Sequence, residues 1–322
     1  MGETVGNVRD AGLAAAGLVA EGAVVERVHT GSIWAEGPLW IPARGRLRWS
    51  DIPNDCIREF DPATGASSLY AAGVEFTNGR ALDRDGSVVQ CSHGNRRVER
   101  DRDGAVETIV DRWDGARLNS PNDVVVHPDG SIWFTDPPYG ITMPREGHPG
   151  EREYGDHFVF RVDPAGRVAP VVTDVGEPNG LAFSPDLARL YVADSAEPAP
   201  GDVRHIRVYD VRHGSRCKNG RAFAAMTPED GVSDGIKVDA QGNVWSSSWT
   251  GVVVFDPDGA EIGRIPIPEV TANLCFGGPD GGDLYIAASS SIYRVRTRTR
   301  DAFGSPAARS ARHRMPQPDA IQ

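Results

Sequence analysis

The chain has 322 residues, of which 39% are hydrophobic and 25% are charged, so it can bury a sizeable core and is not disordered by composition. Its 34 basic and 45 acidic side chains give a formal net charge of −11, which argues against nucleic acids and anionic membrane surfaces as partners. No apolar run reaches the roughly 18 residues of a membrane-spanning helix, so no membrane insertion is expected.

The cysteines and the first residues bear on location. The four cysteines lie far apart and lack the spacing of zinc ligands; they are Cys56, Cys91, Cys217 and Cys275. Residues 11–20 are mildly apolar, but no strongly cationic segment precedes them, so a secretory signal is not expected. We therefore expect reduced thiols in a cytoplasmic protein.

One sequence unit occurs six times along the chain. An acid or amide is followed by a short apolar stretch, a turn rich in Pro, Asp and Gly, and a second apolar stretch, a pattern typical of a β-hairpin. The units begin 42, 44, 57, 55 and 39 residues apart. Their leading residues are Glu36, Asn78, Asn122, Asn179, Asp234 and Asn273.

Most units continue with a third apolar strand, such as 252–256, and a shorter fourth one, such as 261–265. Six units of four strands, each about 40 to 50 residues long, predict an all-β six-bladed β-propeller. The sixth unit lacks a fourth strand after Val295, and residues 24–28 can supply it and close the ring. The predicted propeller spans 24–300, with an N-terminal extension over 1–23 and a disordered tail over 301–322.

The leading residues predict a metal site. If the first strand of each unit is innermost, as is usual in propellers, these six side chains converge at one mouth of the central channel. A single Asn or Asp before Gly commonly caps a turn, but all six leading positions carry a side-chain oxygen. Carboxylate and amide oxygens without His or Cys suit a hard cation, calcium best and magnesium next.

Two long loops and the ends of the second strands are expected at the same mouth. The long spacings place their extra residues in 137–156 and 195–204, which we expect to overhang the cation as lids. His93 could bind substrate, shuttle protons or be structural, and Tyr139 could contact substrate or pack the loop. The second strands end at Asp51, His93, Asp136 and Asp194.

Four motifs, in chain order, resemble the gluconolactonase / senescence marker protein-30 (regucalcin) family: Glu36-Gly-Pro, Ser120-Pro-Asn-Asp123, Glu177-Pro-Asn-Gly180 and Ser233-Asp-Gly-Ile236. The similarity runs from about Glu36 to Val295. It implies a six-bladed propeller that holds one divalent cation, often calcium, and hydrolyses sugar lactones.

The resemblance also implies roles for individual residues. Glu36, Asn179 and Asp234 would bind the metal, Asn122 would contact metal or substrate, and Asp234 stands where the family has its proposed proton acceptor. The segment from His93 to Arg97 looks like the bacterial gluconolactonase branch. The animal branch has an arginine two residues before the motif asparagine, where this chain has Ser120, so the sugar-acid specificity of that branch is not carried over.

The expected chemistry follows from this set. A cation polarises the lactone carbonyl, and a carboxylate, here Asp234, accepts a proton from the attacking water. Asn122, His93 and Tyr139 are the expected contacts to a small lactone substrate, and Mg²⁺, Mn²⁺ or Zn²⁺ could replace Ca²⁺. Two alternatives stay open: a related metal-dependent esterase or phosphotriesterase, and a noncatalytic calcium-binding propeller. A Gly-x-Ser-x-Gly nucleophile motif is absent.

Overall fold

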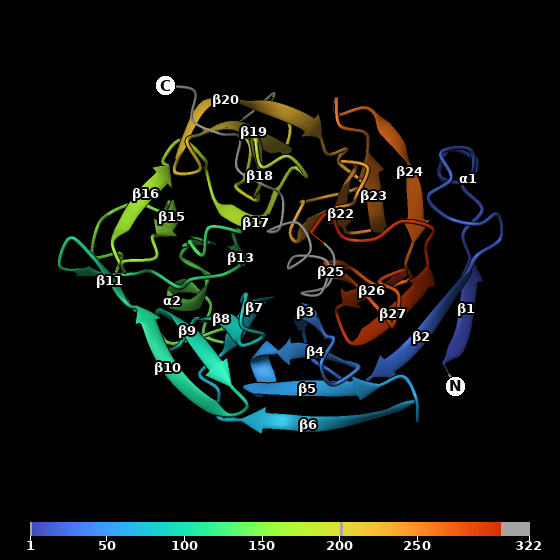
Figure 1. Ribbon diagram of the computed structural model, residues 1–322, viewed down its shortest axis with the longest axis horizontal. Helices are drawn as coiled ribbons and strands as arrows, with labels where there is room; N and C mark the ends of the chain where they lie inside the picture. Colours follow the sequence, from blue (N-terminus) through green and yellow to red (C-terminus); the bar gives the residue numbers. More distant parts are fainter. Residues whose placement is uncertain (1, 200–201, 304–322) are drawn as a thin grey trace, which may run out of the picture.

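A computed structural model describes residues 2–199 and 202–303. Six antiparallel β-sheets stand around a central channel like the blades of a propeller (Figure 1). Each blade coincides with one of the predicted sequence units, and its first strand lies nearest the channel. The predicted all-β six-bladed β-propeller is therefore confirmed.

In blades one to five the strands run outward from the channel in chain order, whereas the fourth strand of blade six comes from the N-terminal part of the chain. Blade one contains β3 (Ala35–Ile41), β4 (Arg46–Asp51), β5 (Cys56–Asp61) and β6 (Ala66–Ala72). Blade two contains β7 (Thr77–Leu82), β8 (Val88–Ser92), β9 (Arg97–Arg102) and β10 (Ala105–Val110). Blade three contains β13 (Val124–Val126), β14 (Ile132–Thr135), β15 (Val159–Val162) and β16 (Val168–Val172). Blade four contains β17 (Pro178–Phe183), β18 (Arg189–Asp194), β19 (His205–Arg212) and β20 (Arg216–Ala225). Blade five contains β21 (Ile236–Val238), β22 (Val244–Ser248), β23 (Gly251–Phe255) and β24 (Glu261–Pro266). Blade six contains β25 (Thr271–Gly277), β26 (Asp283–Ala288), β27 (Ser291–Arg296) and β2 (Val24–Thr30). Smaller elements are η1 (Ile52–Asn54), α2 (Tyr139–Thr142) and the hairpin of β11 (Arg112–Trp113) and β12 (Ala116–Arg117).

The ring is closed by the N-terminal part of the chain. As predicted, β2 pairs with β27, with Val25 opposite Val295. A fifth strand, β1 (Glu3–Asn7), adds outside β2 and was not predicted. The short helix α1 (Ala11–Ala15), capped by Asp10, buries Leu13 in the core between blades five and six. Residues 2–23 are thus packed onto the propeller rather than extending from it.

Apolar side chains fill most of the seams between blades. The second strands of five blades each carry a large buried aromatic residue: Trp49, Trp133, Tyr191, Trp245 and Tyr285. The seam between blades one and two is polar instead. Arg48 pairs with Glu59 of its own blade at 2.9 Å and lies 3.9 Å from Asp101 of blade two, and buried Arg80 of blade two donates to Ser50 Oγ of blade one at 2.6 Å. Hydrophobic burial therefore joins most blades, and a charged network joins these two.

The inner strands change their pairing at the leading residues. Register with the second strand shifts between Glu36 and Leu39, and similar shifts occur in β7, β17 and β25. In the gap, blades two, four and five bond the next blade: Gly79 N donates to Asn122 O at 2.8 Å, Gly180 N to Asp234 O at 2.9 Å and Gly235 N to Ala272 O at 2.8 Å. A Cβ on Gly180 would lie 2.3 Å from that oxygen, so glycine permits the close approach of two blades rather than a tight turn.

The last described residues are also packed. The backbone of Asp301 forms an isolated antiparallel β-bridge with that of Asp239, and Phe303 packs against the two hydrophobic clusters on either side of blade four. The remaining part of the predicted disordered tail, 304–322, lies outside the described residues. Within the described part of the chain, no helix has the length and apolar character needed to cross a membrane.

Candidate functional site

The structure brings the six leading side chains together at one mouth of the channel. An amide chain links three of them: Asn78 Nδ2 donates to Asn122 Oδ1, and Asn122 Nδ2 donates to Asn179 Oδ1, both at 2.5 Å. On the other side of the ring, Asn273 Nδ2 donates to Glu36 Oε2 at 3.0 Å. Asp234 completes the group, because a side-chain hydrogen bond from Asn179 and the charge of Glu36 both act on its carboxyl.

The two carboxyl groups of this ring lie in an acidic, buried environment. Burial raises the pKa of Glu36 to about 7. The pKa of Asp234 is raised well above its ordinary value, first by burial and then by the charges of Glu36, Glu146 and Asp123. Because like charges in a site of low polarity disfavour ionisation, these groups need either protons or a bound cation.

Two channel residues were not predicted. Lys237, on β21, places its amine 3.4 Å from Asn273 Oδ1 and 3.8 Å from Asp123 Oδ2. Asp123 is buried and directly follows the leading Asn122. Both residues belong to the repeated unit, so the sequence indicated that they lie on inner strands. The motif spacing, however, did not indicate that their side chains reach the site. The amine of Lys237 shares the site with four acidic side chains, those of Glu36, Asp123, Glu146 and Asp234, so acidic groups outnumber basic ones in the site.

His93 lies at the end of β8 and is fully buried. Its Nε2 atom is 3.0 Å from Asn122 Oδ1, and its Nδ1 atom is 3.0 Å from the backbone oxygen of Glu146. Burial lowers the pKa of this imidazole, which favours the neutral ring. Since protein atoms already engage both ring nitrogens, His93 reaches the channel through Asn122 rather than directly.

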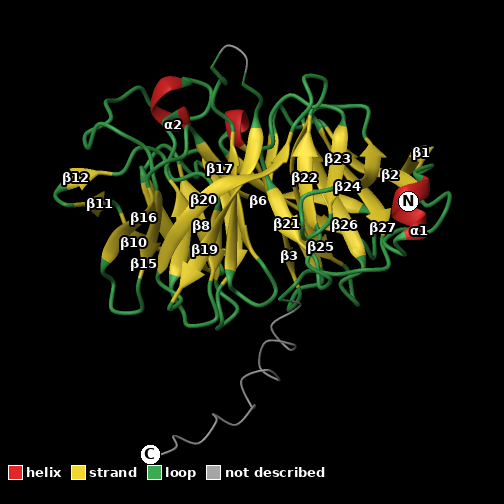
Figure 2. Ribbon diagram, turned by 90° about the horizontal axis from the view of Figure 1, so that it is seen from above, coloured by secondary structure: helices red, strands yellow, loops and turns green. Residues whose placement is uncertain are grey.

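The loop 137–156 covers this side of the mouth and carries α2, on one face of the ring in Figure 2. Buried Ser120 holds it, because its hydroxyl donates to Pro137 O at 2.6 Å and accepts from Gly140 N at 2.9 Å. A Cβ on Gly140 would lie 2.6 Å from that of His93 and 2.7 Å from that of Ser120. An arginine at position 120 would therefore have to displace the lid.

Tyr139 begins α2 and directs its hydroxyl toward the site. Burial and the charges of Glu177 and Asp234 raise the pKa of this phenol well above its ordinary value. No residue that the structure describes lies at normal hydrogen-bond distance from this buried hydroxyl, although the side chains of Ser195 and Glu177 are near enough to act on its pKa. An unpartnered buried hydroxyl beside Asp234 is suited to contact a bound substrate.

The second long loop, 195–204, begins with a direct contact to the site. Ser195 Oγ accepts from Asn179 Nδ2 at 3.2 Å and donates to Ser233 O at 2.9 Å. It therefore links the leading residue of blade four to the residue that precedes Asp234. Residues 200 and 201 of this loop lie outside the described part of the chain.

Three of the residues that end the second strands have a structural task. Each aspartate accepts hydrogen bonds from the backbone of the loop before its own inner strand: Asp51 from Ile33, Asp136 from Asn119 and Ser120, and Asp194 from Gly176 and Glu177. Their repeated position therefore serves to place the inner strands. It does not bring their carboxylates into the cluster of leading side chains.

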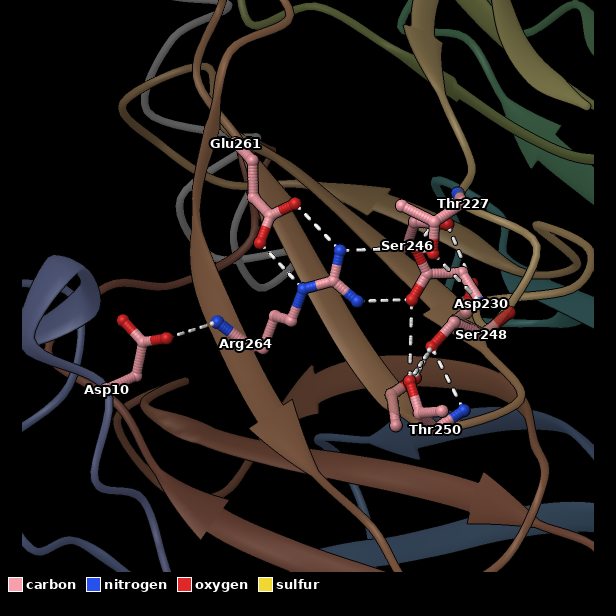
Figure 3. A network of polar contacts seen from close by, with 10 residues as sticks. Asp10, Thr227, Asp230, Ser246, Ser248, Thr250, Glu261 and Arg264 are labelled. Atoms are coloured by element: carbon pink, nitrogen blue, oxygen red, sulfur yellow. Dashed lines mark hydrogen bonds and ion pairs between the residues drawn. The ribbon is translucent and has the colours of Figure 1, made fainter. Parts of the chain in front are cut away.

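A polar network anchors the segment that leads to Asp234 (Figure 3). Buried Asp230 accepts from Thr227 N at 3.0 Å and from Thr227 Oγ1 at 2.6 Å, and it forms an ion pair with Arg264 on β24. The backbone amide of Arg264 donates to Asp10 Oδ2 at 2.9 Å. The outer strand, the cap of α1 and the loop before Asp234 are thus joined.

The donor set of the channel fits a hard divalent cation. Within residues 2–199 and 202–303, no three His, Cys, Asp or Glu side chains form a metal-binding group. The mouth instead gathers the carboxyls of Glu36 and Asp234 beside the amide of Asn179, and the pKa values of both acids are raised first by burial and then by neighbouring carboxylates. Oxygen donors of this kind are those that calcium and magnesium prefer.

Comparison with known proteins places the chain in a family. The model of the SMP-30/Gluconolactonase/LRE-like region matches residues 34–290. The chain belongs to this family. It is 33% identical to a gluconolactonase of Zymomonas mobilis, over 85% of this chain and 82% of that one, and 33% identical to a pentonolactonase of Haloferax volcanii, over 83% and 85%. The solved gluconolactonase of Xanthomonas campestris superposes with a TM-score of 0.83 at 35% identity, covering 92% of this chain and 97% of that one.

Proposed function

We propose that this protein hydrolyses a sugar lactone with the help of one divalent cation, calcium being the first choice. The observation that carries the proposal is the buried pair of Glu36 and Asp234, whose pKa values are both raised, at the channel mouth of a protein that is similar to sugar lactonases. A cation would relieve the repulsion between the two carboxylates.

Glu36, Asn179 and Asp234 are the residues that would hold the cation. When bound, such a cation supplies Lewis acidity toward a carbonyl oxygen. Asp234 lies at the rim of the channel and accepts a proton from the attacking water, which adds to the lactone carbonyl carbon. The ring C–O bond then breaks, the ring oxygen takes up a proton, and the product is a hydroxy acid.

The lid and the channel mouth supply the contacts that orient the substrate. Tyr139 presents a hydroxyl without a partner among the described residues, and Asn122 lies between the ligand Asn179 and the buried His93. Hydrogen bonds from such groups would fix the sugar hydroxyls and exclude bulk water. Four unpaired cysteines agree with a cytoplasmic location, which we also propose.

A hydrolysis screen tests the function. Chelated protein is assayed with a pH indicator against a hexonolactone, a pentonolactone, an aryl ester and a phosphotriester, each with Ca²⁺, Mg²⁺, Mn²⁺ or Zn²⁺. We expect turnover of one or both lactones that disappears on chelation and returns with a divalent cation. Turnover of only the ester or the phosphotriester would overturn the substrate class, and full activity after chelation would overturn the role of the cation.

A further inference from the structure

Both nitrogens of the His93 ring face oxygen atoms. Nδ1 lies 3.0 Å from Glu146 O, and Nε2 lies 3.0 Å from Asn122 Oδ1 and, at the longer distance of 3.4 Å, from Asn78 Nδ2. A carbonyl oxygen can only accept a hydrogen bond, so the two contacts together require a doubly protonated ring. The ring is fully buried and neither of these partners carries a charge, so an imidazolium would lack a hydrogen-bonded counter-charge.

A neutral ring removes this conflict if the side-chain amide of one partner rotates so that its NH₂ group, not its oxygen, faces the ring. The oxygen of Glu146 belongs to the backbone and cannot turn, so Nδ1 keeps its proton and Nε2 becomes an acceptor. The amide of Asn122 can rotate by half a turn, which exchanges its oxygen and NH₂ ends with little change in shape. Its NH₂ group then donates to His93, and its oxygen faces Asn179.

Rotation of the Asn122 amide requires the neighbouring amides of Asn78 and Asn179 to rotate as well. Asn78 must also turn, so that its oxygen accepts from the NH₂ group of Asn122. Its present oxygen has no partner among the residues that the structure describes, and the turn gives up the 3.4 Å contact of its Nδ2 atom with His93 Nε2, which the NH₂ group of the turned Asn122 replaces. Asn179 must then offer its NH₂ group to Asn122. The hydroxyl of Ser195 can donate to the oxygen of a turned Asn179, but its single proton then leaves Ser233 O, so the turn exchanges one hydrogen bond for another at this end.

We propose that His93 is a positioning residue, which orients the amides of Asn122 and Asn179 so that Asn179 presents its oxygen to the cation. The inference rests on the proposed cation site. With its NH₂ group toward Asp234, Asn179 has no lone pair to offer a metal. With its oxygen there, it repels the carboxylate until a cation lies between them. Cation binding and the turned amides therefore stabilise each other.

Calorimetric titration of chelated protein with calcium tests the role of His93. His93→Leu removes the acceptor and should weaken calcium binding by about 10- to 100-fold, as loss of a partner that orients a metal ligand commonly does. His93→Gln can place an oxygen near the site of Nε2 and should recover most of the affinity. His127, another buried histidine, follows β13 at the opposite end of that strand, so His127→Leu should leave calcium affinity unchanged.

Nitrogen NMR of ¹⁵N-histidine in the wild-type protein provides a readout that does not depend on whether the leucine variant folds. The signal absent from His93→Gln identifies His93. With calcium bound, we expect a neutral ring protonated at Nδ1. A proton on Nε2, a doubly protonated ring, or wild-type calcium affinity in His93→Leu would overturn the inference. If the wild-type protein binds none of the four cations, the proposed cation site is itself wrong, and the inference fails with it.

Discussion

The backbone amide of Gly180 donates to the backbone oxygen of Asp234 at 2.9 Å, which joins blades four and five beside two of the proposed ligands. The Asn-Gly and Asp-Gly pairs of this chain therefore have two functions. The first residue offers a side-chain oxygen to the channel, and the glycine lets the neighbouring inner strand approach. Blade packing and ligand geometry are coupled through the same contact.

Gly180→Ala tests this coupling. The new Cβ would lie 2.3 Å from Asp234 O and push the two inner strands apart, so we expect a loss of about 1–3 kcal/mol in the free energy of unfolding. Calcium affinity should fall by about tenfold or more, because the two ligands move relative to each other. Gly6→Ala is the matched control, since no atom lies within 4 Å of its added Cβ. Unchanged calcium affinity in Gly180→Ala would separate blade packing from the ligand geometry.

Glu36 predicts how the stability of the metal-free protein depends on pH. Its pKa is raised from 4.5 to about 7, so the folded state holds a proton that the unfolded state has lost. The resulting stabilisation is present below pH 4.5 and is lost as the pH rises through 7. In chelator, urea unfolding should show a steeper fall over this range for the wild-type protein than for Glu36→Gln.

Calcium should reverse this effect, adding about 2.7 kcal/mol at a free concentration 100 times the Kd. The gain should be larger at pH 8 than at pH 5, where protons compete for the carboxylates. Glu261→Gln, at a position on β24 where the side chain is 40% exposed, should behave like the wild-type protein in both conditions. A Glu36→Gln variant with the pH profile of the wild-type protein would contradict the assignment.

Ser120→Ala tests the attachment of the lid. The change removes a hydroxyl that bonds Pro137 O and Gly140 N, so we expect a cost of about 1–3 kcal/mol and a raised KM. Thr142→Ala removes another hydroxyl of the lid, one that bonds Pro138 O at 2.9 Å near the surface, and should change KM little. Equal kinetics in the two variants would show that Ser120 does not position the substrate contacts.

Substitutions of Asp234 and of Asn122 should change different kinetic parameters. Asp234→Ala removes both a ligand and the proton acceptor, and kcat should fall by about 10²- to 10⁴-fold. Excess calcium should restore little activity to Asp234→Asn if the carboxylate is the base. Asn122→Ala removes a neutral group and should affect KM as well as kcat, at about 1–3 kcal/mol. Near-wild-type lactone turnover by Asp234→Ala in calcium would refute the mechanism.

Asp230→Asn tests the network of Figure 3. Arg264 and Thr227 hold the pKa of Asp230 below its ordinary value although burial opposes them. The change should cost about 3 kcal/mol, the lower end for a buried pair because the Arg264 side chain is 34% exposed. Thermal unfolding measures the cost, with Glu261→Gln as the control for the second partner of Arg264. A melting temperature equal to that of the control would argue against the network.

The repeated unit was sufficient to predict the blades, because hairpin periodicity and turn residues act locally. Ring closure by 24–28 followed from a missing strand in the sixth unit. By contrast, β1 was not predicted, since Glu3–Asn7 is short and largely polar and forms only against β2. The convergence of the leading side chains followed from propeller geometry alone.

The surroundings of these side chains could not be predicted from the pattern. Glu146 acts on the site from the middle of a long loop, and its backbone oxygen meets a histidine fifty-three residues earlier. Ser120 drew attention as the first residue of a motif and as a departure from the animal branch, whereas the structure shows that its hydroxyl holds Gly140 of the lid. Contacts of this kind depend on loop paths, which carry no sequence period.

The pairing of Val25 with Val295 also has a kinetic consequence. It is among the contacts of longest sequence separation in the described chain, and loop-closure entropy opposes such contacts until much of the intervening chain is ordered. Closure of the ring should therefore be a late event in folding, preceded by species in which β27 exposes an unpaired edge. Such an edge can pair with the β2 segment of another molecule, so refolding at high protein concentration should favour strand-exchanged dimers.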